Sequence, residues 1–379
     1  MTIRILHTYK AYKPDPTGGI AEVIARIVAD CGEYENTILV ARMRGSSHTF
    51  RQDSATIRAV FSFGTTSSLP IAPSYPLALA TIARKFDLIV HHAPFPLADL
   101  GLLIPRPHCT GLIVYWHADL VRSNLVVRSL APFLRHSLKC ADRIVVSHDI
   151  VAQNSSLLRP FADKCVVIPY AVDWVYWSNL VGSQNSEASS LRCRFPRLIA
   201  AAGRLVPYKG FNVLLKALRQ IDAQLIIIGA GPLQRELERN IRSFGLSDRV
   251  LLTGQIDRDE MKFIFHAARV FAFPSVTPAE AFGLVQLEAM ASGLPVINTS
   301  LPTAVPEVAR HGAEALTVMP NDPKALAAAL VKVLDDEEFA ARLGQAGQER
   351  ARKEFSPDAF CKGITELYEE VLQSRKKNQ

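Results

Sequence analysis

The sequence contains no uninterrupted run of about 18 apolar residues, the length at which a helix begins to span a bilayer. It also begins directly with a strand-like stretch at residues 3–6 instead of a signal peptide. We therefore expect neither a membrane-spanning segment nor a secretory signal.

Cysteine is scarce and scattered, and its six residues form no CxxC pair. This spacing argues against a zinc site and is typical of a protein from the reduced cytosol. The chain also has no dense Lys/Arg stripe with interleaved aromatic residues, so we expect no nucleic-acid partner. The cysteines are Cys31, Cys109, Cys140, Cys165, Cys193 and Cys361.

The net charge of +7 is unevenly distributed. Residues 1–174 hold 18 Lys and Arg against 13 Asp and Glu, and eight of the ten histidines, whereas the rest holds 25 against 23. A basic first half favours an anionic partner such as a phosphate group or a membrane surface.

Runs of Ile, Val and Leu alternate with helical stretches along the 379 residues, which suffice for two domains. This alternation predicts parallel sheets covered by helices on both faces. We expect an α/β protein of two doubly wound, Rossmann-like domains, 1–173 and 197–355, joined by a polar linker at 174–196 and facing a central cleft, where such folds bind ligands. The expected strands are 3–8, 36–41, 88–91, 110–116, 143–147 and 165–169, then 198–202, 224–228, 250–253, 270–273, 295–298 and 315–318.

The stretch 274–295 combines a Pro-rich turn with a run of helix formers, 284–291, which a glycine and a proline close. The turn therefore lies at a helix N-terminus, where backbone N–H groups lack intrahelical partners and can bind an anion. These groups belong to Phe282, Gly283 and Leu284.

Two carboxylates, Glu280 and Glu288, bracket this turn. Eight residues at about 100° each would leave them roughly 80° apart on one helix. We therefore place Glu280 on the loop before the helix and Glu288 inside it. Taken alone, the pair has a simpler alternative, a solvated glutamate favoured by the helix dipole and an exposed helix glutamate.

Three further motifs follow expected strands. Gly18 and Gly19 precede the first helix, where a glycine pair can cradle a phosphate. Arg204 and Lys209 follow the first strand of the second domain, and a guanidinium with an ammonium suits a diphosphate. His117 ends a strand of the first domain. Taken singly, these could also be a plain turn, a solvated basic loop and a structural histidine.

Together the motifs resemble the retaining glycosyltransferases of family four, which have the GT-B fold. The resemblance covers nearly the whole chain and is strongest in the second domain, where the motifs follow the family's order. The chain departs from the family at 169–173, where Pro-Tyr-Ala-Val-Asp replaces Pro-Asn-Gly-Val-Asp, and at 301–306, which lacks glycine. The matching residues are Gly203-Arg204, Lys209-Gly210, Gly229-Ala230-Gly231-Pro232, Thr253-Gly254, Glu280, Gly283, Glu288 and Pro295, and in the first half Gly18-Gly19, His117-Ala118-Asp119 and residues 168–173.

The resemblance implies a role for each candidate residue. Arg204 and Lys209 would hold the donor diphosphate and offset the charge that grows on it as the sugar leaves, assisted by the three backbone N–H groups. Glu280 would bind hydroxyls of the donor sugar, and Glu288 the ribose hydroxyls. The glycine pair would lie against the phosphates, and His117 beside the sugar and the acceptor.

The resemblance also implies chemistry without a cofactor or a metal, since two cations and a helix end would already face the diphosphate and no DxD motif stands in a suitable loop. Retention would follow from same-face attack, with the departing phosphate oxygen taking the acceptor proton. The last segment, 356–379, would form a helix that packs back on the first domain.

Around residues 204–210 and 279–288 the chain is similar to α-mannosyltransferases of xanthan and acetan assembly. These enzymes move mannose from GDP-mannose onto a cellobiosyl-diphosphopolyprenol lipid. The implied partners are a nucleotide sugar donor and a polyprenyl-diphosphate-linked saccharide acceptor in exopolysaccharide biosynthesis. The alternatives are another donor or acceptor, a sugar-nucleotide 2-epimerase or a phosphorylase on the same fold, and a non-catalytic binding subunit.

A lipid-linked acceptor would bring the enzyme to an anionic surface, so we expect a peripheral protein on the cytoplasmic face of the inner membrane. Residues 120–142 fit this role, because apolar positions recur there at helical spacing among basic residues. The alternative is an ordinary domain helix with solvated basic residues. The basic residues are Arg122, Arg128, Arg135 and Lys139.

Overall fold

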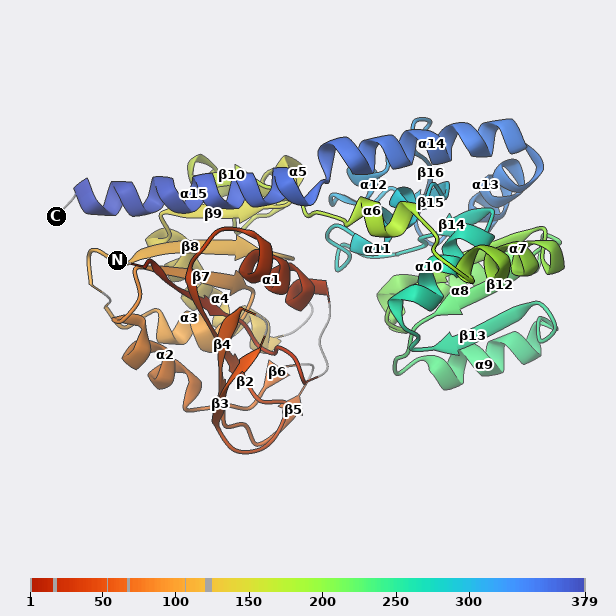
Figure 1. Cartoon of the computed structure of the whole chain (residues 1–379). Coiled ribbons are helices and arrows are strands. Elements are labelled where there is room, and N and C mark those ends of the chain that lie inside the picture. The colour runs from red at the N-terminus through yellow and green to blue at the C-terminus, as the bar shows by residue number, and fades with distance from the viewer. Residues whose placement is uncertain are drawn as a thin grey trace. The chain divides into compact units, whose positions relative to one another are not determined.

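The computed structural model describes residues 2–15, 19–52, 54–66, 69–105, 107–119 and 125–377, with the backbone alone for 125–129. The chain divides into two compact units, residues 1–170 with 358–379 and residues 171–357. Each unit is built on its own sheet (Figure 1).

The sheet of the first unit has the order β10-β9-β8-β7-β1-β2-β4-β3, and each described pairing is parallel except β3 with β4. The inner strands are almost fully buried because helices cover both of their faces, and most of their residues are apolar. The strands are β1 (Arg4–Thr8), β2 (Glu35–Ala41), β3 (His48–Gln52), β4 (Ala55–Val60), β7 (Leu88–Ala93), β8 (Gly111–Trp116), β9 (Arg143–Val146) and β10 (Cys165–Val167), with a separate short pair, β5 (Thr65–Thr66) and β6 (Leu69–Pro70).

Helices from both ends of the chain cover one face of this sheet (Figure 1). These are α1 (Gly19–Asp30) and α15 (Pro357–Lys377), whose Arg375 pairs with Asp142 at 2.7 Å. The helices after β6 and β7 and the helix after β8 pack on the opposite face. They are α2 (Tyr75–Ala83), α3 (Pro96–Gly101) and α4 (Leu125–Cys140), followed by α5 (Asp149–Asn154) and the 3-10 turn η1 (Arg159–Lys164).

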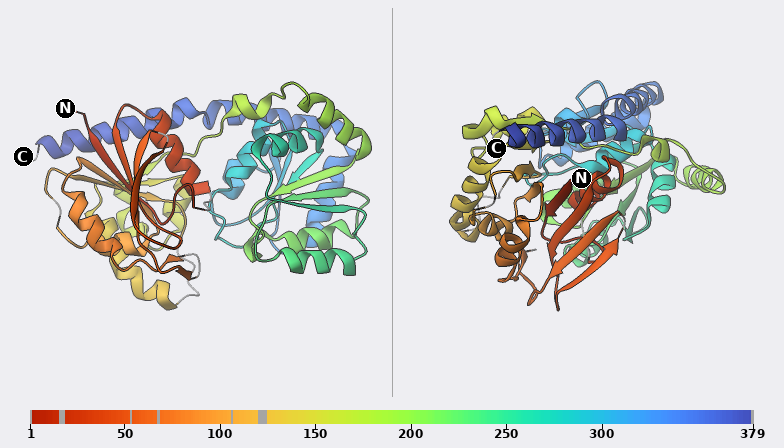
Figure 2. Two further views of the ribbon diagram at one scale, coloured as in Figure 1. Left: turned by 60° about the horizontal axis from the view of Figure 1, so that its bottom comes forward. Right: turned by 60° about the vertical axis from the view of Figure 1, so that its left-hand side comes forward.

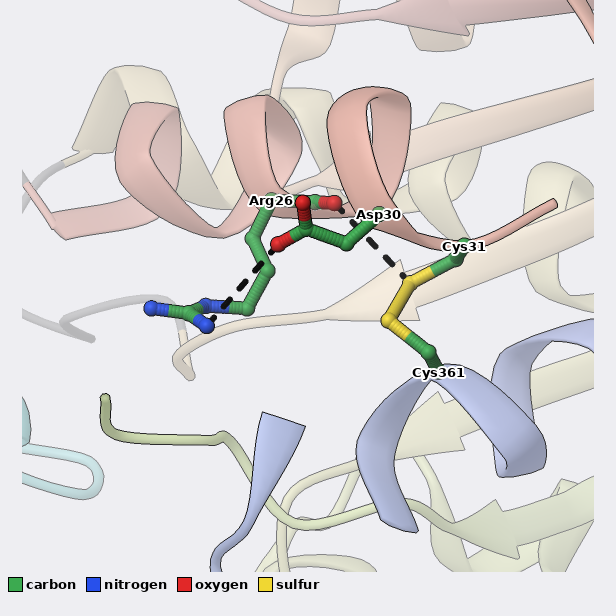
Figure 3. The surroundings of a disulfide bond; sticks show 4 residues. All are labelled: Arg26, Asp30, Cys31 and Cys361. Carbon is green, nitrogen blue, oxygen red and sulfur yellow. Dashed lines mark hydrogen bonds and ion pairs between the residues drawn. A yellow bond between two sulfur atoms is a disulfide. The ribbon is translucent and has the colours of Figure 1, made fainter. Parts of the chain in front are cut away.

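A disulfide joins Cys31, at the end of α1, to Cys361 of α15 (Figure 3). Near it, Arg26 pairs with Asp30 at 3.9 Å, and the Arg26 carbonyl lies 3.9 Å from the Cys31 sulfur. The scattered cysteines gave no indication of a disulfide, because the two partners lie 330 residues apart and only the fold brings them together. We expected the reduced thiols that are typical of a cytosolic protein, and the Cys31–Cys361 pair was not predicted.

The second unit has a fully parallel six-stranded sheet in the order β13-β12-β11-β14-β15-β16 (Figure 2). This is the strand order of dinucleotide-binding folds, which bind ligands where the order reverses, here beyond the ends of β11 and β14. The strands are β11 (Leu198–Ala202), β12 (Gln224–Ile228), β13 (Val250–Gly254), β14 (Val270–Ala272), β15 (Val296–Thr299) and β16 (Ala315–Val318).

Helices pack on both faces of this second sheet. Residues of α8, α9 and α13 share an apolar core with one face, and Phe265 of α10 packs on Phe271 of β14 on the other. The helices are α6 (Trp174–Ser178), α7 (Gln184–Arg194), α8 (Phe211–Leu218), α9 (Gln234–Ser243), α10 (Arg258–Ala267), α11 (Leu284–Ala291), α12 (Val305–Val308), α13 (Pro323–Asp335) and α14 (Glu337–Glu354).

The twelve expected strands are confirmed within two residues at each end, and the helix expected at 284–291 is confirmed as α11. The segment 174–196, expected to be a linker, instead contains α6 and α7 and folds with the second unit. His266 of α10 binds the Trp177 carbonyl at 2.7 Å, so tertiary contacts hold this polar sequence in place. Strands β3 to β6 were not expected.

Candidate active site

Lys209 ends the 3-10 turn η2 (Pro207–Lys209), which follows β11. Gly210 terminates this turn with a φ of 70°, and a Cβ atom there would lie 1.9 Å from the Pro274 carbonyl oxygen. The amide of Val276 also donates to the Tyr208 carbonyl at 2.8 Å. The loops after β11 and β14 therefore pack against each other, which brings Lys209 to the point where the strand order reverses.

Lys209 and Glu280 form a nearly buried ion pair. Their Nζ and Oε2 atoms lie 2.5 Å apart, and the two side chains are 11% and 10% exposed. Glu280 Oε2 also accepts from the Ser275 hydroxyl at 3.0 Å, while the Ser275 carbonyl accepts from the Thr299 hydroxyl at 2.6 Å. Lys209 and Ser275 thus both bind the Glu280 carboxylate. This contact holds the Lys209 ammonium against the loop that precedes α11.

The N-terminus of α11 follows Glu280 closely in the chain. Gly283 caps it with a φ of 81°, and a Cβ atom there would lie 2.6 Å from the Phe273 ring. Phe282 is buried, and its carbonyl accepts from the Gln286 side chain at 2.7 Å. Leu284 begins the helix and is half-buried. The first N–H groups of α11 form the positive end of the helix, which favours an anion.

The two glutamates lie as expected, Glu280 on the loop before α11 and Glu288 inside the helix, where it is half-buried. Arg204 follows β11 and is exposed. Burial raises the pKa of Tyr208, and the charges of Lys209 and Arg204 partly oppose this effect. This site therefore combines two cations, one carboxylate that compensates Lys209, and a helix N-terminus.

The only DxD-like triplet, Asp257-Arg258-Asp259, lies elsewhere and has structural partners. Asp257 forms a capping box with Glu260 at the start of α10, and Asp259 accepts from the Tyr176 hydroxyl at 2.8 Å. Among the described residues, no three His, Cys, Asp or Glu side chains are grouped so that they could hold a metal ion. That the reaction needs no metal stays a prediction.

In the first unit, His117 directly follows β8 and is 4% exposed. Both ring nitrogens have protein partners, His92 Nδ1 at 2.8 Å and the Tyr170 hydroxyl at 2.6 Å. Gly19 begins α1 and is exposed, whereas Gly18 lies outside the described residues.

The helix expected near residues 120–142 is present as α4. Its Leu134 and Leu138 belong to the core of the first unit, so in this half the apolar face is not available to a membrane. Arg135 and Lys139 are exposed. Arg122 and the side chain of Arg128 lie outside the described part of the chain. Among the described residues, no helix is both long and apolar enough to cross a bilayer.

Sequence reasoning missed the side chains that support the site. Ser275 and Gln286 are fully buried and bind Glu280 and the Phe282 carbonyl. The sequence does show Gln286 as a polar residue within the mainly apolar run 284–291, but it does not show which group this side chain binds. His92 was also missed, although the pair His91-His92 interrupts the apolar strand β7.

Comparison with known proteins agrees with this geometry. The family described as Glycosyl transferases group 1 matches residues 186–350, and the family described as Glycosyl transferase 4-like domain matches residues 18–171. Among solved structures, HepE of Anabaena in complex with UDP superposes with a TM-score of 0.77 at 20% identity, covering 97% of this chain and 100% of that one. Such likenesses show that the fold is the α/β GT-B fold.

Curated relatives extend the likeness along the chain. O-antigen chain mannosyltransferase C of Escherichia coli is 27% identical over 98% of this chain and 100% of its own length. An uncharacterized glycosyltransferase of Methanocaldococcus jannaschii is 31% identical, over 76% of this chain and 77% of its own. A GDP-mannose-dependent alpha-(1-6)-phosphatidylinositol monomannoside mannosyltransferase of Mycobacterium tuberculosis is 35% identical over 45% of this chain and 46% of its own.

Proposed function

The chain belongs to the glycosyltransferases, and we propose that it is a retaining α-mannosyltransferase of group 1. The donor is GDP-mannose, and the acceptor is a lipid-diphosphate-linked saccharide such as cellobiosyl-diphosphopolyprenol in exopolysaccharide assembly. The names of two relatives support mannose as the sugar, and one of them supports GDP-mannose as its carrier.

The observation that carries the proposal is the Lys209–Glu280 pair before the N-terminus of α11, at the reversal point of the sheet. A diphosphate brings negative charge, whereas a sugar brings hydroxyl groups. An ammonium, an exposed guanidinium from Arg204 and a helix end suit the diphosphate, and a fixed carboxylate suits the hydroxyls.

In the proposed reaction, the bond between the anomeric carbon and the diphosphate oxygen breaks as the acceptor hydroxyl attacks from the same face. The departing phosphate oxygen takes the acceptor proton, and Lys209, Arg204 and the first N–H groups of α11 stabilise the growing negative charge. Glu280 orients the sugar, and Glu288 binds the ribose. The resemblance assigns Gly19 and His117 to the same substrates.

A sugar-nucleotide 2-epimerase is the second candidate, because the same diphosphate and hydroxyl contacts would serve it. The two reactions differ in their need for an acceptor. An epimerase releases or isomerises the donor sugar without an acceptor, whereas a transferase forms product only when the acceptor is present.

The test is incubation of the purified protein with labelled GDP-mannose, UDP-glucose and ADP-glucose, with and without a lipid extract of cells that contains polyprenyl-diphosphate saccharides. We expect acceptor-dependent transfer from GDP-mannose into the lipid fraction. Lys209→Met is the matched inactive control. Conversion of a donor at the same rate without lipid would support the epimerase, and no turnover of any donor would contradict both.

The proposed location is the cytoplasmic face of the inner membrane, as a peripheral protein. Disulfides are rare in a reducing cytosol, so we expect Cys31 and Cys361 to be reduced in the cell and to pair on oxidation. Acid quenching of cells, alkylation of the denatured protein and mass spectrometry test this, since failure of both thiols to react before reduction would place the enzyme in an oxidising compartment.

A further inference from the structure

A chain of five polar side chains crosses the sheet of the first unit. It runs from Asn36 on β2 through His7 on β1 and His92 on β7 to His117 after β8, and ends at Tyr170 after β10. In the strand pairing, Asn36 lies opposite Ile5, His7 opposite Val90, and His92 opposite Tyr115. Each histidine therefore follows, by two residues, the position that faces the previous residue of the chain of side chains. Because side chains two residues apart share a face, all of these residues project from one face of the sheet. All five are buried.

The contacts form an unbroken line of hydrogen bonds. The distances are 3.3 Å from Asn36 Oδ1 to His7 Nε2 and 3.2 Å from His7 Nδ1 to His92 Nε2. They are 2.8 Å from His92 Nδ1 to His117 Nε2 and 2.6 Å from His117 Nδ1 to the Tyr170 hydroxyl. Successive imidazole planes differ by 24° and 15°, so each N–H can point at the neighbouring lone pair.

The three imidazoles are neutral near pH 7. Burial lowers the pKa of His7 to about 4 and that of His117 to about 3, and it holds the pKa of His92 well below its usual range. A neutral imidazole carries one N–H and one acceptor nitrogen. The line therefore has only two consistent arrangements of its protons, with every N–H on Nε2 or every N–H on Nδ1.

Asn36 distinguishes between these two arrangements. Its amide nitrogen lies 3.4 Å from the Tyr34 carbonyl, to which it donates, and this contact turns Oδ1 toward His7. An oxygen can only accept, so His7 donates from Nε2, and His92 and His117 must follow in the same sense. Burial raises the pKa of Tyr170, so its hydroxyl keeps the proton that it donates to His117 Nδ1. The reverse arrangement would place the Asn36 oxygen against the Tyr34 carbonyl.

We propose that Asn36 is a positioning residue that acts through His7 and His92 to hold His117 as its Nε2–H tautomer. The Nδ1 atom of His117 is then an acceptor only. This inference deepens the proposed function and rests on it for the substrate: a sugar or acceptor hydroxyl that displaces the Tyr170 hydroxyl meets a lone pair and must donate to it. His117 therefore selects a hydroxyl donor at this position and does not supply a proton.

The opposite face of the same strands provides an internal control. His91 Nε2 lies 3.1 Å from an Asp99 carboxylate oxygen, and its Nδ1 lies 2.9 Å from the Thr8 hydroxyl. A carboxylate accepts only, which places an N–H of His91 on Nε2 without any contribution from Asn36. Thr8, His91 and Asp99 are at most 1% exposed, so substrate does not reach them. The NMR signals of His91 therefore report whether the sheet is intact.

The test is long-range proton–nitrogen NMR of the full chain with nitrogen-labelled histidine at pH 7.5. In wild type we expect His7, His92 and His117 to carry their proton on Nε2. In Asn36→Leu, His7 Nε2 faces an apolar side chain, and an unpaired acceptor is tolerated better than an unpaired N–H, so the line should reverse to Nδ1–H. Asn36→Asp keeps an acceptor oxygen toward His7, and its second oxygen, when protonated, still donates to the Tyr34 carbonyl, so this variant should keep the wild-type tautomers.

A wild-type His117 with its proton on Nδ1 would overturn the inference. So would an unchanged His117 in Asn36→Leu while the His91 signals show an intact sheet. In transfer assays, Asn36→Leu should lower kcat roughly ten-fold at unchanged donor KM, because one hydrogen bond is reversed, and Asn36→Asp should restore it. Equal kcat for wild type and the correctly folded Leu variant would also count against the inference.

The two proposals can fail separately. The NMR experiment needs no substrate. If the histidines show the expected tautomers but the protein transfers no sugar from any donor, only the proposed function is contradicted. If the protein transfers mannose normally but the histidine tautomers do not change in Asn36→Leu, only the positioning role of Asn36 is contradicted.

Discussion

Removal of Lys209 should affect stability and catalysis separately, because the lysine is both a ligand for the proposed diphosphate and the partner of a buried carboxylate. In Lys209→Met, the Glu280 carboxylate, whose side chain is 10% exposed, loses its ion partner and keeps the hydrogen bond from the Ser275 hydroxyl. Breaking one side of a buried ion pair costs about 3–5 kcal/mol, and the residual exposure and the Ser275 bond place this case near 3 kcal/mol. For a unit of this size, that is a fall in Tm of roughly 6–12 °C.

The double variant Lys209→Met with Glu280→Gln separates the two effects. It removes both charges and keeps the Ser275 hydrogen bond to an amide oxygen, so most of the lost Tm should return. Transfer should stay down by about 10²–10³ in both variants, since the cation is still absent. Calorimetric melting and a donor assay on wild type, both single variants and the double variant complete the cycle. A single variant as stable as wild type would refute the buried-pair argument, and a double variant with normal transfer would refute the diphosphate role.

Three further predictions concern the two glutamates, the buried histidines of the first unit and residues 120–142. Glu288→Ala should weaken binding of free GDP by about 10–100-fold, the worth of a charged hydrogen bond, whereas Glu280→Ala should mainly lower kcat; unchanged calorimetric affinity in the Glu288 variant would refute the ribose role. The lowered pKa values of His7 and His117 mean that the unfolded chain binds more protons below pH 6.5, so the free energy of unfolding should fall by about 2 kcal/mol per histidine at pH 5; equal urea midpoints at pH 7.5 and pH 5 would contradict this. Changing the four basic residues of 120–142 to Gln should release the protein from anionic vesicles at low salt, at about 1 kcal/mol per residue, and failure of wild type to co-sediment would remove the membrane role.

The sequence predicts the sheets well because their strands are nearly continuous apolar runs. The bounds of α11 were predictable for a different reason, since a glycine precedes the helix and Gly293 and Pro295 end it. The edge strand β3 is polar except at Phe50 and mostly exposed, and it lies at the end of the sheet beside β4, so its sequence resembles a loop. Helix α7 contains three Ser and few apolar residues, so its sequence alone does not predict a helix, and it packs against α10.

The candidate site was only partly predictable. The motif places Glu280 before α11, but nothing in the spacing indicates that Lys209 is its ion partner, because the loops after β11 and β14 meet only in the folded sheet. The Cys31–Cys361 disulfide and the line from Asn36 to Tyr170 have the same origin, since each joins residues that parallel strands or helices bring together from distant parts of the chain.

The measurement that tests the central claim most directly is the structure of the product formed from GDP-mannose and a purified polyprenyl-diphosphate-linked cellobiose. Lipid-linked saccharide is isolated after the reaction, and NMR gives the configuration of the new anomeric centre. We predict one added mannose in α configuration, formed by wild type and not by Lys209→Met. A β-linked mannose would contradict the retaining mechanism, and a lipid fraction without added mannose, from a protein that turns over another donor, would contradict the assignment of donor and acceptor.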